Sequence, residues 1–260
     1  SEHFNEIAQT AKNSPTRSKC HANPHYTPEP ICKLGAPKEQ TTWASIGDSH
    51  TVELAYSMGN ILNKHNDSLY QYSFSGCLPS HSTTEIFQTR CTKRYQSAVG
   101  KIIADQSISN VIIGHRWFSE KNQEMMNPGV SDIRNETLES LILTIEDLSK
   151  SKNVYVILPF PEPSKHINLL LSQYERKDDT FTEAEGETLN EYNERNELLI
   201  KKLSSYQFNE NVKFIKPTDA LCDTEKCFTV KDSKSMYFDD TNPSIYETAL
   251  VAELIEKQAF

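Results

Sequence analysis

The chain has 260 residues and a net charge of −9, from 36 acidic and 27 basic side chains. This length can bury a full core as one domain, and the acidic balance argues against binding of nucleic acid or of an anionic membrane surface through charge. A neutral, cationic or carbohydrate partner fits better. No apolar run approaches the roughly 18 residues that a membrane helix needs, and no signal peptide is expected at the N-terminus.

The N-terminal part, residues 1–40, differs in composition from the rest. It is polar and contains five of the twelve prolines. This composition predicts an extended linker that packs on a domain rather than a domain of its own. We therefore expect residues 41–260 to form the catalytic domain, preceded by a 1–40 extension.

From residue 41 onward, short apolar runs alternate with longer segments of helical periodicity. The expected strands are 42–46, 69–74, 110–114, 153–158 and 211–215. The expected helices are 51–64, 92–106, 133–150, 186–203 and 244–257. This alternation predicts a three-layer α/β/α fold with a parallel, mostly five-stranded sheet.

Glycine placement points to the edge of the sheet where a ligand would bind. The chain has only eight glycines, yet Gly47, Gly76 and Gly114 each follow one of the first three expected strands. Doubly wound sheets bind ligands at the carboxyl ends of their strands, and glycine allows a close approach there. A functional site is therefore expected at this edge.

Ser49 is the candidate nucleophile. An apolar strand runs into Gly47, Asp48 and Ser49, and a helical pattern begins at once. A serine at such a junction lies beside free backbone N–H groups and the positive end of the helix dipole. The geometry exposes a hydroxyl and supplies donors for an oxyanion. The alternative is that Ser49 only caps the helix.

The six cysteines fall into three local pairs, and an even count at short separations favours disulfides and an oxidising compartment. Sequence alone permits 15 connectivities, but pairing of nearest neighbours needs the least chain rearrangement. The expected bridges are Cys20–Cys32, Cys77–Cys91 and Cys222–Cys227. Six reduced thiols are the alternative. The spacing is not that of a zinc site, so neither a metal nor a cofactor is expected.

Two further segments carry motifs of a known family. Gly76 lies in a Ser-Gly-Cys sequence after the second strand, and residues 237–244 precede the last helix. Together with the Gly-Asp-Ser block of Ser49, they resemble the blocks of the SGNH hydrolase superfamily, which has a flavodoxin-like fold. The resemblance implies Ser49 as nucleophile, Asp239 as the triad aspartate, and the N–H groups of Ser49 and Gly76 as the oxyanion hole.

The chain departs from the family at the general base. The family has an Asp-x-x-His block, but the residue three positions after Asp239 is Asn242. An amide has no basic lone pair at neutral pH and cannot take a proton from Ser49. The triad would therefore be Ser49, Asp239 and Asn242, and this form is expected to be inactive or impaired.

A second group of features resembles one subgroup of the family. These are Arg116-Trp117 after the third strand, the late cysteine pair and a Tyr-Phe-Asp-Asp sequence. They resemble SGNH domains fused to bacterial acyltransferase-3 membrane proteins that O-acetylate lipopolysaccharide O-antigen and related surface polysaccharides. The resemblance implies a periplasmic domain of an inner-membrane protein, an acyltransferase-3 membrane domain in the same polypeptide as partner, and a polysaccharide acceptor.

Four residues near the predicted site are expected to bind substrate: Asp48, His50, Arg116 and Trp117. An arginine fork and a flat aromatic face suit a carbohydrate. A place in the core is the alternative for Trp117, and a dipole-favoured acid at the helix start is the alternative for Asp48. His50 and His115 are candidate replacements for the missing base.

Three functions remain open. The first is an O-acetyltransferase domain acting on sugar hydroxyls of a bacterial surface polysaccharide. The second is a secreted SGNH carbohydrate esterase, which differs only in using water as acceptor. The third is a catalytically dead module that retains the cleft and binds glycans.

Overall fold

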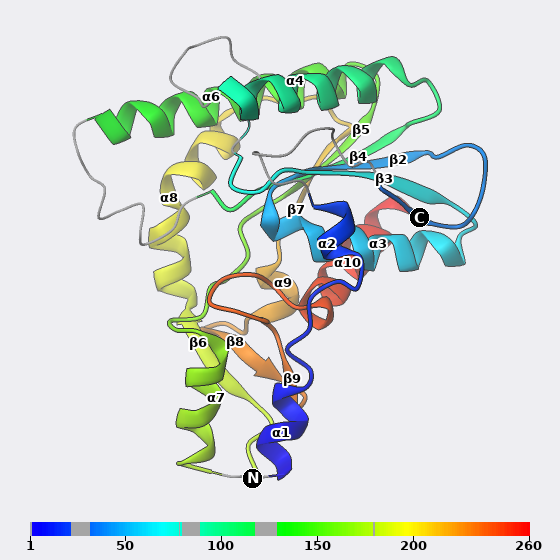
Figure 1. The fold of residues 1–260 in the computed structure, drawn as a ribbon. Helices are drawn as coiled ribbons and strands as arrows, with labels where there is room; N and C mark the ends of the chain where they lie inside the picture. The colour runs from blue at the N-terminus through cyan, green and yellow to red at the C-terminus, as the bar shows by residue number, and fades with distance from the viewer. Residues whose placement is uncertain (1, 22–31, 78, 80–88, 118–128, 179) are drawn as a thin grey trace.

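A six-stranded sheet forms the middle of three layers (Figure 1). The computed structural model describes residues 2–21, 32–77, 79, 89–117, 129–178 and 180–260. The strand order is β1-β3-β2-β4-β5-β7, with β1 antiparallel to β3 and the other five strands mutually parallel. The strands are β1 (Cys32–Gly35), β2 (Trp43–Gly47), β3 (Ser68–Ser73), β4 (Asn110–Gly114), β5 (Asn153–Ile157) and β7 (Val212–Ile215). The expected parallel α/β/α fold is confirmed, and each of the five expected strands overlaps one of the parallel strands.

Helices cover both faces of this sheet, above and below it in Figure 1. One core lies between the sheet and the first group: α4 (Thr89–Ala104), α6 (Gly129–Ser149) and α8 (Leu189–Ser205). The other core lies between the sheet and α3 (Val52–Lys64) with α10 (Ile245–Ala259). All five helices overlap the helices expected from periodicity.

The central strand shows why these sequences form a doubly covered sheet. All five residues of β2 are buried. Ala44 and Ile46 belong to the core under α4 and α6, whereas Trp43 belongs to the core with α3 and α10. Successive side chains of a strand point to opposite faces, so an apolar run without alternation requires cover on both sides.

The N-terminal segment contributes to the fold. It contains α1 (Glu2–Ala8), α2 (Arg17–Cys20) and β1, and the last of these pairs with β3 as an edge strand. Helix α1 lies beside α7 (Ile167–Glu175) at the lower end of the molecule in Figure 1.

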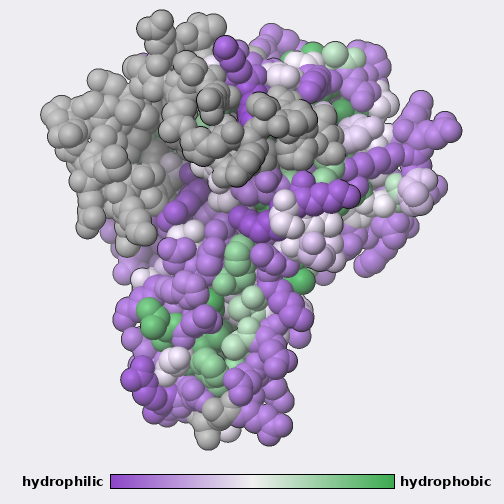
Figure 2. All heavy atoms as spheres, viewed as in Figure 1, coloured by the Kyte–Doolittle hydropathy of each residue, from purple (hydrophilic) through white to green (hydrophobic). Residues whose placement is uncertain are grey.

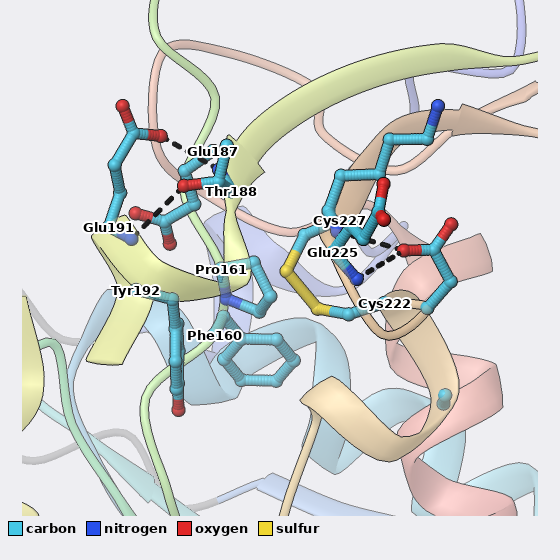
Figure 3. Close-up of a disulfide and its surroundings, with 12 residues drawn as sticks. Phe160, Pro161, Glu187, Thr188, Glu191, Tyr192, Cys222, Glu225 and Cys227 are labelled. Atoms are coloured by element: carbon cyan, nitrogen blue, oxygen red, sulfur yellow. Dashed lines mark hydrogen bonds between the residues drawn. A yellow bond between two sulfur atoms is a disulfide. The ribbon is translucent and has the colours of Figure 1, made fainter.

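A second, three-stranded sheet was not predicted. It has the order β6-β8-β9, from β6 (Ala184–Thr188), β8 (Lys226–Lys231) and β9 (Lys234–Ser235), with the short helix α9 (Thr218–Leu221) before β8. The expected helix 186–203 is wrong at its start, because residues up to Thr188 are in β6. Thr188 caps α8: its Oγ1 accepts from the Glu191 backbone N–H, and the Glu191 carboxylate accepts from the Thr188 N–H (Figure 3). This reciprocal capping box fixes where the helix begins.

All six cysteines are paired as expected. The bridges are Cys20–Cys32, Cys77–Cys91 and Cys222–Cys227. Figure 3 shows the last of these joining the end of α9 to β8, beside the start of α8. The other two bridges join the end of α2 to the start of β1 and the turn after β3 to the first turns of α4.

The coloured surface of the face shown in Figure 2 is mostly hydrophilic. Hydrophobic residues visible there gather in the lower part of the molecule, where Figure 1 places α1, α7 and the small sheet. None of the helices in the described ranges combines the length and apolar composition that crossing a membrane requires.

Candidate active site

The turn that carries Ser49 lies at the point where the strand order reverses. Strand β2 has β3 on one side and β4 on the other, so the crossovers that follow β2 and β3 leave in opposite directions. Open α/β sheets bind ligands outside the carboxyl ends of their strands at such a switch point. β2 ends at Gly47, and a 3₁₀ turn over Ser49–Thr51 leads directly into α3. The half-buried Ser49 is the first residue of this turn.

Asp48 joins this turn to the neighbouring strand. Its Oδ1 accepts from the backbone N–H of His50 at 2.9 Å, and its Oδ2 accepts from that of Arg116 at 2.8 Å. The residue is only 4% exposed, and burial raises the pKa of its carboxyl to about 6, against the lowering effect of the two N–H donors. Both oxygens are engaged within the protein, which favours an orienting role for Asp48.

The two histidines near Ser49 are both buried. His115 lies against the Tyr95 hydroxyl through Nε2 and against the Cys77 carbonyl through Nδ1, and burial lowers its pKa to about 3. His50 is 2% exposed, and burial and nearby arginines hold its pKa well below the usual value. Its Nε2 has no hydrogen-bond partner in the part of the chain that the structure describes. Both imidazoles are therefore neutral near pH 7.

The depressed pKa of His115 makes a testable contribution to stability. In the unfolded chain the His115 imidazole binds a proton with its usual pKa of 6.5, whereas in the native protein it does so only near pH 3. The contribution is therefore fully present above the unfolded pKa and is lost as pH falls toward the folded pKa. We expect His115→Gln to reduce the stability lost between about pH 7 and about pH 5 by about 2 kcal/mol. Urea denaturation of both proteins at the two pH values measures this, and parallel pH profiles would contradict it.

The loop before α10 is closed by Asp239. Its Oδ1 accepts from the backbone N–H groups of Thr241 and Asn242, and its Oδ2 accepts from the Asn242 side-chain amide at 2.7 Å. The Asn242 amide thus donates to Asp239, as an imidazole N–H would in its place. The other amide atom, Asn242 Oδ1, is buried and has no partner among the described residues.

One side chain from the N-terminal segment touches both candidate blocks. Arg17 Nη1 lies 3.4 Å from the backbone oxygen of Ser49, and the Arg17 guanidinium lies 5.1 Å from the centre of the Phe238 ring. Phe238 precedes Asp239. Within the described ranges, no hydrogen bond joins the Ser49 hydroxyl to Asn242. The assignment of the triad therefore stays a prediction.

Gly76 lies in a turn directly after β3. Its φ of +65° is a conformation that glycine adopts without strain. The Cys77 N–H donates to the Phe74 carbonyl, and the Phe74 N–H donates to the carbonyl of Gly47. This turn is therefore fastened to the end of β2, two residues before Ser49.

Arg116 and Trp117 occupy different environments. Arg116 makes a two-pronged ion pair with Glu162, through Nε at 2.9 Å and Nη2 at 3.1 Å. Trp117 is 3% exposed, packs in the core with its ring 4.9 Å from that of His115, and leaves its Nε1 without a partner among the described residues. The burial favours the core alternative for Trp117.

Sequence reasoning missed two charged residues at this edge. Glu162 follows β5, so its position after a parallel strand could have indicated it. It lines a pocket of about 460 Å³ with Glu187, Glu191 and Arg195. Arg17 lies in the polar extension, and no pattern in the sequence marks it. No group of three or more His, Cys, Asp or Glu residues within the described ranges could hold a metal ion.

A parallel α/β/α sheet with a Gly-Asp-Ser turn after its central strand defines the class of SGNH hydrolase-like folds. A family model described as the SGNH domain (fused to AT3 domains) matches residues 19–257. The chain therefore belongs to this family.

A solved structure of similar fold supports this assignment. The periplasmic domain of the Salmonella ser. Paratyphi A lipopolysaccharide acetyltransferase is similar with a TM-score of 0.61 at 11% identity, over 99% of this chain and 95% of that chain. A carbohydrate acetylesterase from Sinorhizobium meliloti has a TM-score of 0.43 at 10% identity, over 84% of this chain and 98% of that chain. No curated protein matches the sequence.

Proposed function

We propose that this chain is the acyl-transfer domain of a bacterial surface-polysaccharide O-acetyltransferase, with Ser49 as its nucleophile. In this proposal it works in the periplasm, fused to an acyltransferase-3 membrane domain that delivers the acetyl group. The observation that carries the proposal is the Ser49 turn at the switch point of the sheet. It occurs in a chain that belongs to the family described as SGNH domains fused to AT3 domains.

The proposed reaction has two steps. The Ser49 oxygen attacks the carbonyl carbon of the donor, and the leaving group departs with a proton to give an acetyl-serine. A sugar hydroxyl then attacks the carbonyl carbon of this ester, the bond from that carbon to the Ser49 oxygen breaks, and the proton of the sugar hydroxyl passes to the Ser49 oxygen, which regenerates the free serine and leaves the acetyl group on the sugar. The backbone N–H groups of Ser49 and Gly76 would hold the oxyanion in both steps, and loss of one such donor typically costs about 2.7–4 kcal/mol.

Proton transfer is the step that this chain performs poorly. Asp239 already accepts from the Asn242 amide, so the pair keeps the orientation of an aspartate–histidine pair. Asn242 nevertheless offers no basic nitrogen to Ser49. This favours an impaired transferase. It also favours the second candidate, a glycan-binding module that has lost turnover, because the Asp239–Asn242 contact is satisfied without a proton relay.

The test compares the chain with its Asn242→His variant, each supplied with a chromogenic acetyl ester and a set of neutral oligosaccharides. We expect the variant to yield acetylated oligosaccharide, detected by mass spectrometry, and Asn242→His/Ser49→Ala to yield none. Release of acetate alone would indicate an esterase instead. Glycan binding by both proteins without any turnover would support the binding module and contradict the transferase.

A further inference from the structure

We propose that the N-terminal segment completes the active site, with Arg17 as a positioning residue that holds the Ser49 turn against the Asp239–Asn242 loop. The inference rests on the proposed role of Ser49 as nucleophile. It adds a residue from the predicted linker to the machinery of the reaction.

Arg17 is attached to α3, the helix that follows the Ser49 turn. Arg17 Nη1 donates to Glu53 Oε1 at 2.9 Å and to Oε2 at 2.7 Å. The Glu53 side chain is 0% exposed in the first turn of α3, and Ser14 N–H donates to the same carboxylate at 3.1 Å. A buried carboxylate needs such partners to remain charged. The same Nη1 lies 3.4 Å from the Ser49 carbonyl oxygen, at the long end of a hydrogen bond.

Arg17 also contacts the loop that contains Asp239 and Asn242. The Arg17 guanidinium lies over the ring of Phe238, and a cation in this position is attracted to the face of the ring. The Phe238 N–H donates to the carbonyl of Asn242 at 3.2 Å, so Phe238 belongs to the closed loop that contains Asp239. One guanidinium therefore contacts both blocks on which the proposed triad depends.

The segment around Arg17 is itself fixed to the main fold. Cys20, at the end of α2, is bonded to Cys32 at the start of β1. Its carbonyl accepts from Ser73 Oγ at 3.3 Å, at the end of β3. Upstream, the Lys12 carbonyl accepts from the Ile245 N–H at the start of α10. Arg17 thus lies between anchored points on both sides, as a positioning residue requires.

The test uses the Asn242→His background, in which turnover is expected, and adds Arg17→Gln or Arg17→Lys. Gln removes the charge, whereas Lys keeps the charge toward Glu53 but has no planar guanidinium to lie over the Phe238 ring. Arg176→Gln is the matched control. Arg176 is exposed at the C-terminal end of α7, and its Nε donates to the backbone carbonyl of Ser172 in the same helix.

We expect Arg17→Gln to lower kcat by about tenfold to hundredfold with little change in KM, since small misplacements of reacting groups cost this much. Arg17→Lys should recover part of the loss, and Arg176→Gln should match its parent. An unchanged kcat in a folded Arg17→Gln protein would overturn the proposal.

A second measurement does not depend on turnover. The second measurement compares amide hydrogen exchange in the original chain, which has Asn242, with exchange in its Arg17→Gln variant. Exchange should be faster in the variant in both 49–53 and 238–242, while the exchange rates of β4 stay unchanged. Unchanged exchange in either segment would overturn the positioning role. Changed exchange together with no Ser49-dependent turnover in Asn242→His would retain the positioning role and refute the proposed function instead, so the two failures are distinguishable.

Discussion

Replacing Asn242 with histidine is expected to raise acetyl-ester turnover by about 10²–10⁴-fold, the usual contribution of a general base. Asp239 Oδ2 already accepts from the side-chain amide at position 242, at 2.7 Å. An imidazole in the same place would donate from Nδ1 to this oxygen, which fixes the tautomer and leaves Nε2 free to take the Ser49 proton. Chromogenic acetyl-ester hydrolysis by the two purified proteins measures the ratio directly.

The control is Ser49→Ala in the Asn242→His background, which should abolish the gain. Equal rates with and without the new histidine would mean that the base lies elsewhere or that the cleft only binds. The structure makes His50 and His115 poor substitutes, because they are 2% and 3% exposed and burial lowers the pKa of each.

The main sheet could be predicted from the sequence because its strands are continuous apolar runs. β4 and β5 are buried along almost their whole length, and residues such as Ile112 and Ile113 pack in different cores. Such runs, separated by amphipathic helices, have few arrangements other than a doubly covered parallel sheet.

The small sheet and the edge strand could not be predicted for an equally physical reason. β6 has the sequence Ala-Glu-Gly-Glu-Thr and mixes buried and exposed positions. β1 is four residues long and carries one lysine. Short polar strands of this kind are specified by the partners that pair with them, and those partners are distant in the sequence.

The candidate site divides in the same way. Ser49, Asp239 and Asn242 lie in blocks that a reader of the sequence can recognise, since each block is local. Arg17 acts through Glu53 and Phe238, which are 36 and 221 positions away in the chain. A residue whose partners are set by the tertiary fold leaves no local pattern, so only the structure shows it.

Replacing Gly47 with alanine is expected to destabilise the protein by at least about 3 kcal/mol, at the upper end for overpacking. Gly47 pairs with Gly114 on the neighbouring strand. A Cβ on Gly47 would lie 2.1 Å from the Gly114 backbone oxygen and 2.4 Å from Thr51 Oγ1. Relief of these contacts would require backbone movement at the end of β2, two residues before Ser49. We therefore expect Gly47→Ala to remove the turnover of the Asn242→His protein as well.

Gly100→Ala is the matched control, because it makes the same chemical change on the exposed side of α4, where an added Cβ meets no atom within 4 Å. Alanine is the better helix former, so this variant should be neutral or more stable by up to about 1 kcal/mol. Urea denaturation separates the two outcomes, because a shift of the midpoint at an unchanged slope of the transition reports a change in the free energy of unfolding. A Gly47→Ala protein as stable as Gly100→Ala would show that the end of β2 has room for a side chain. The close packing of Gly47, Gly114 and Thr51 would then not be what shapes the Ser49 turn.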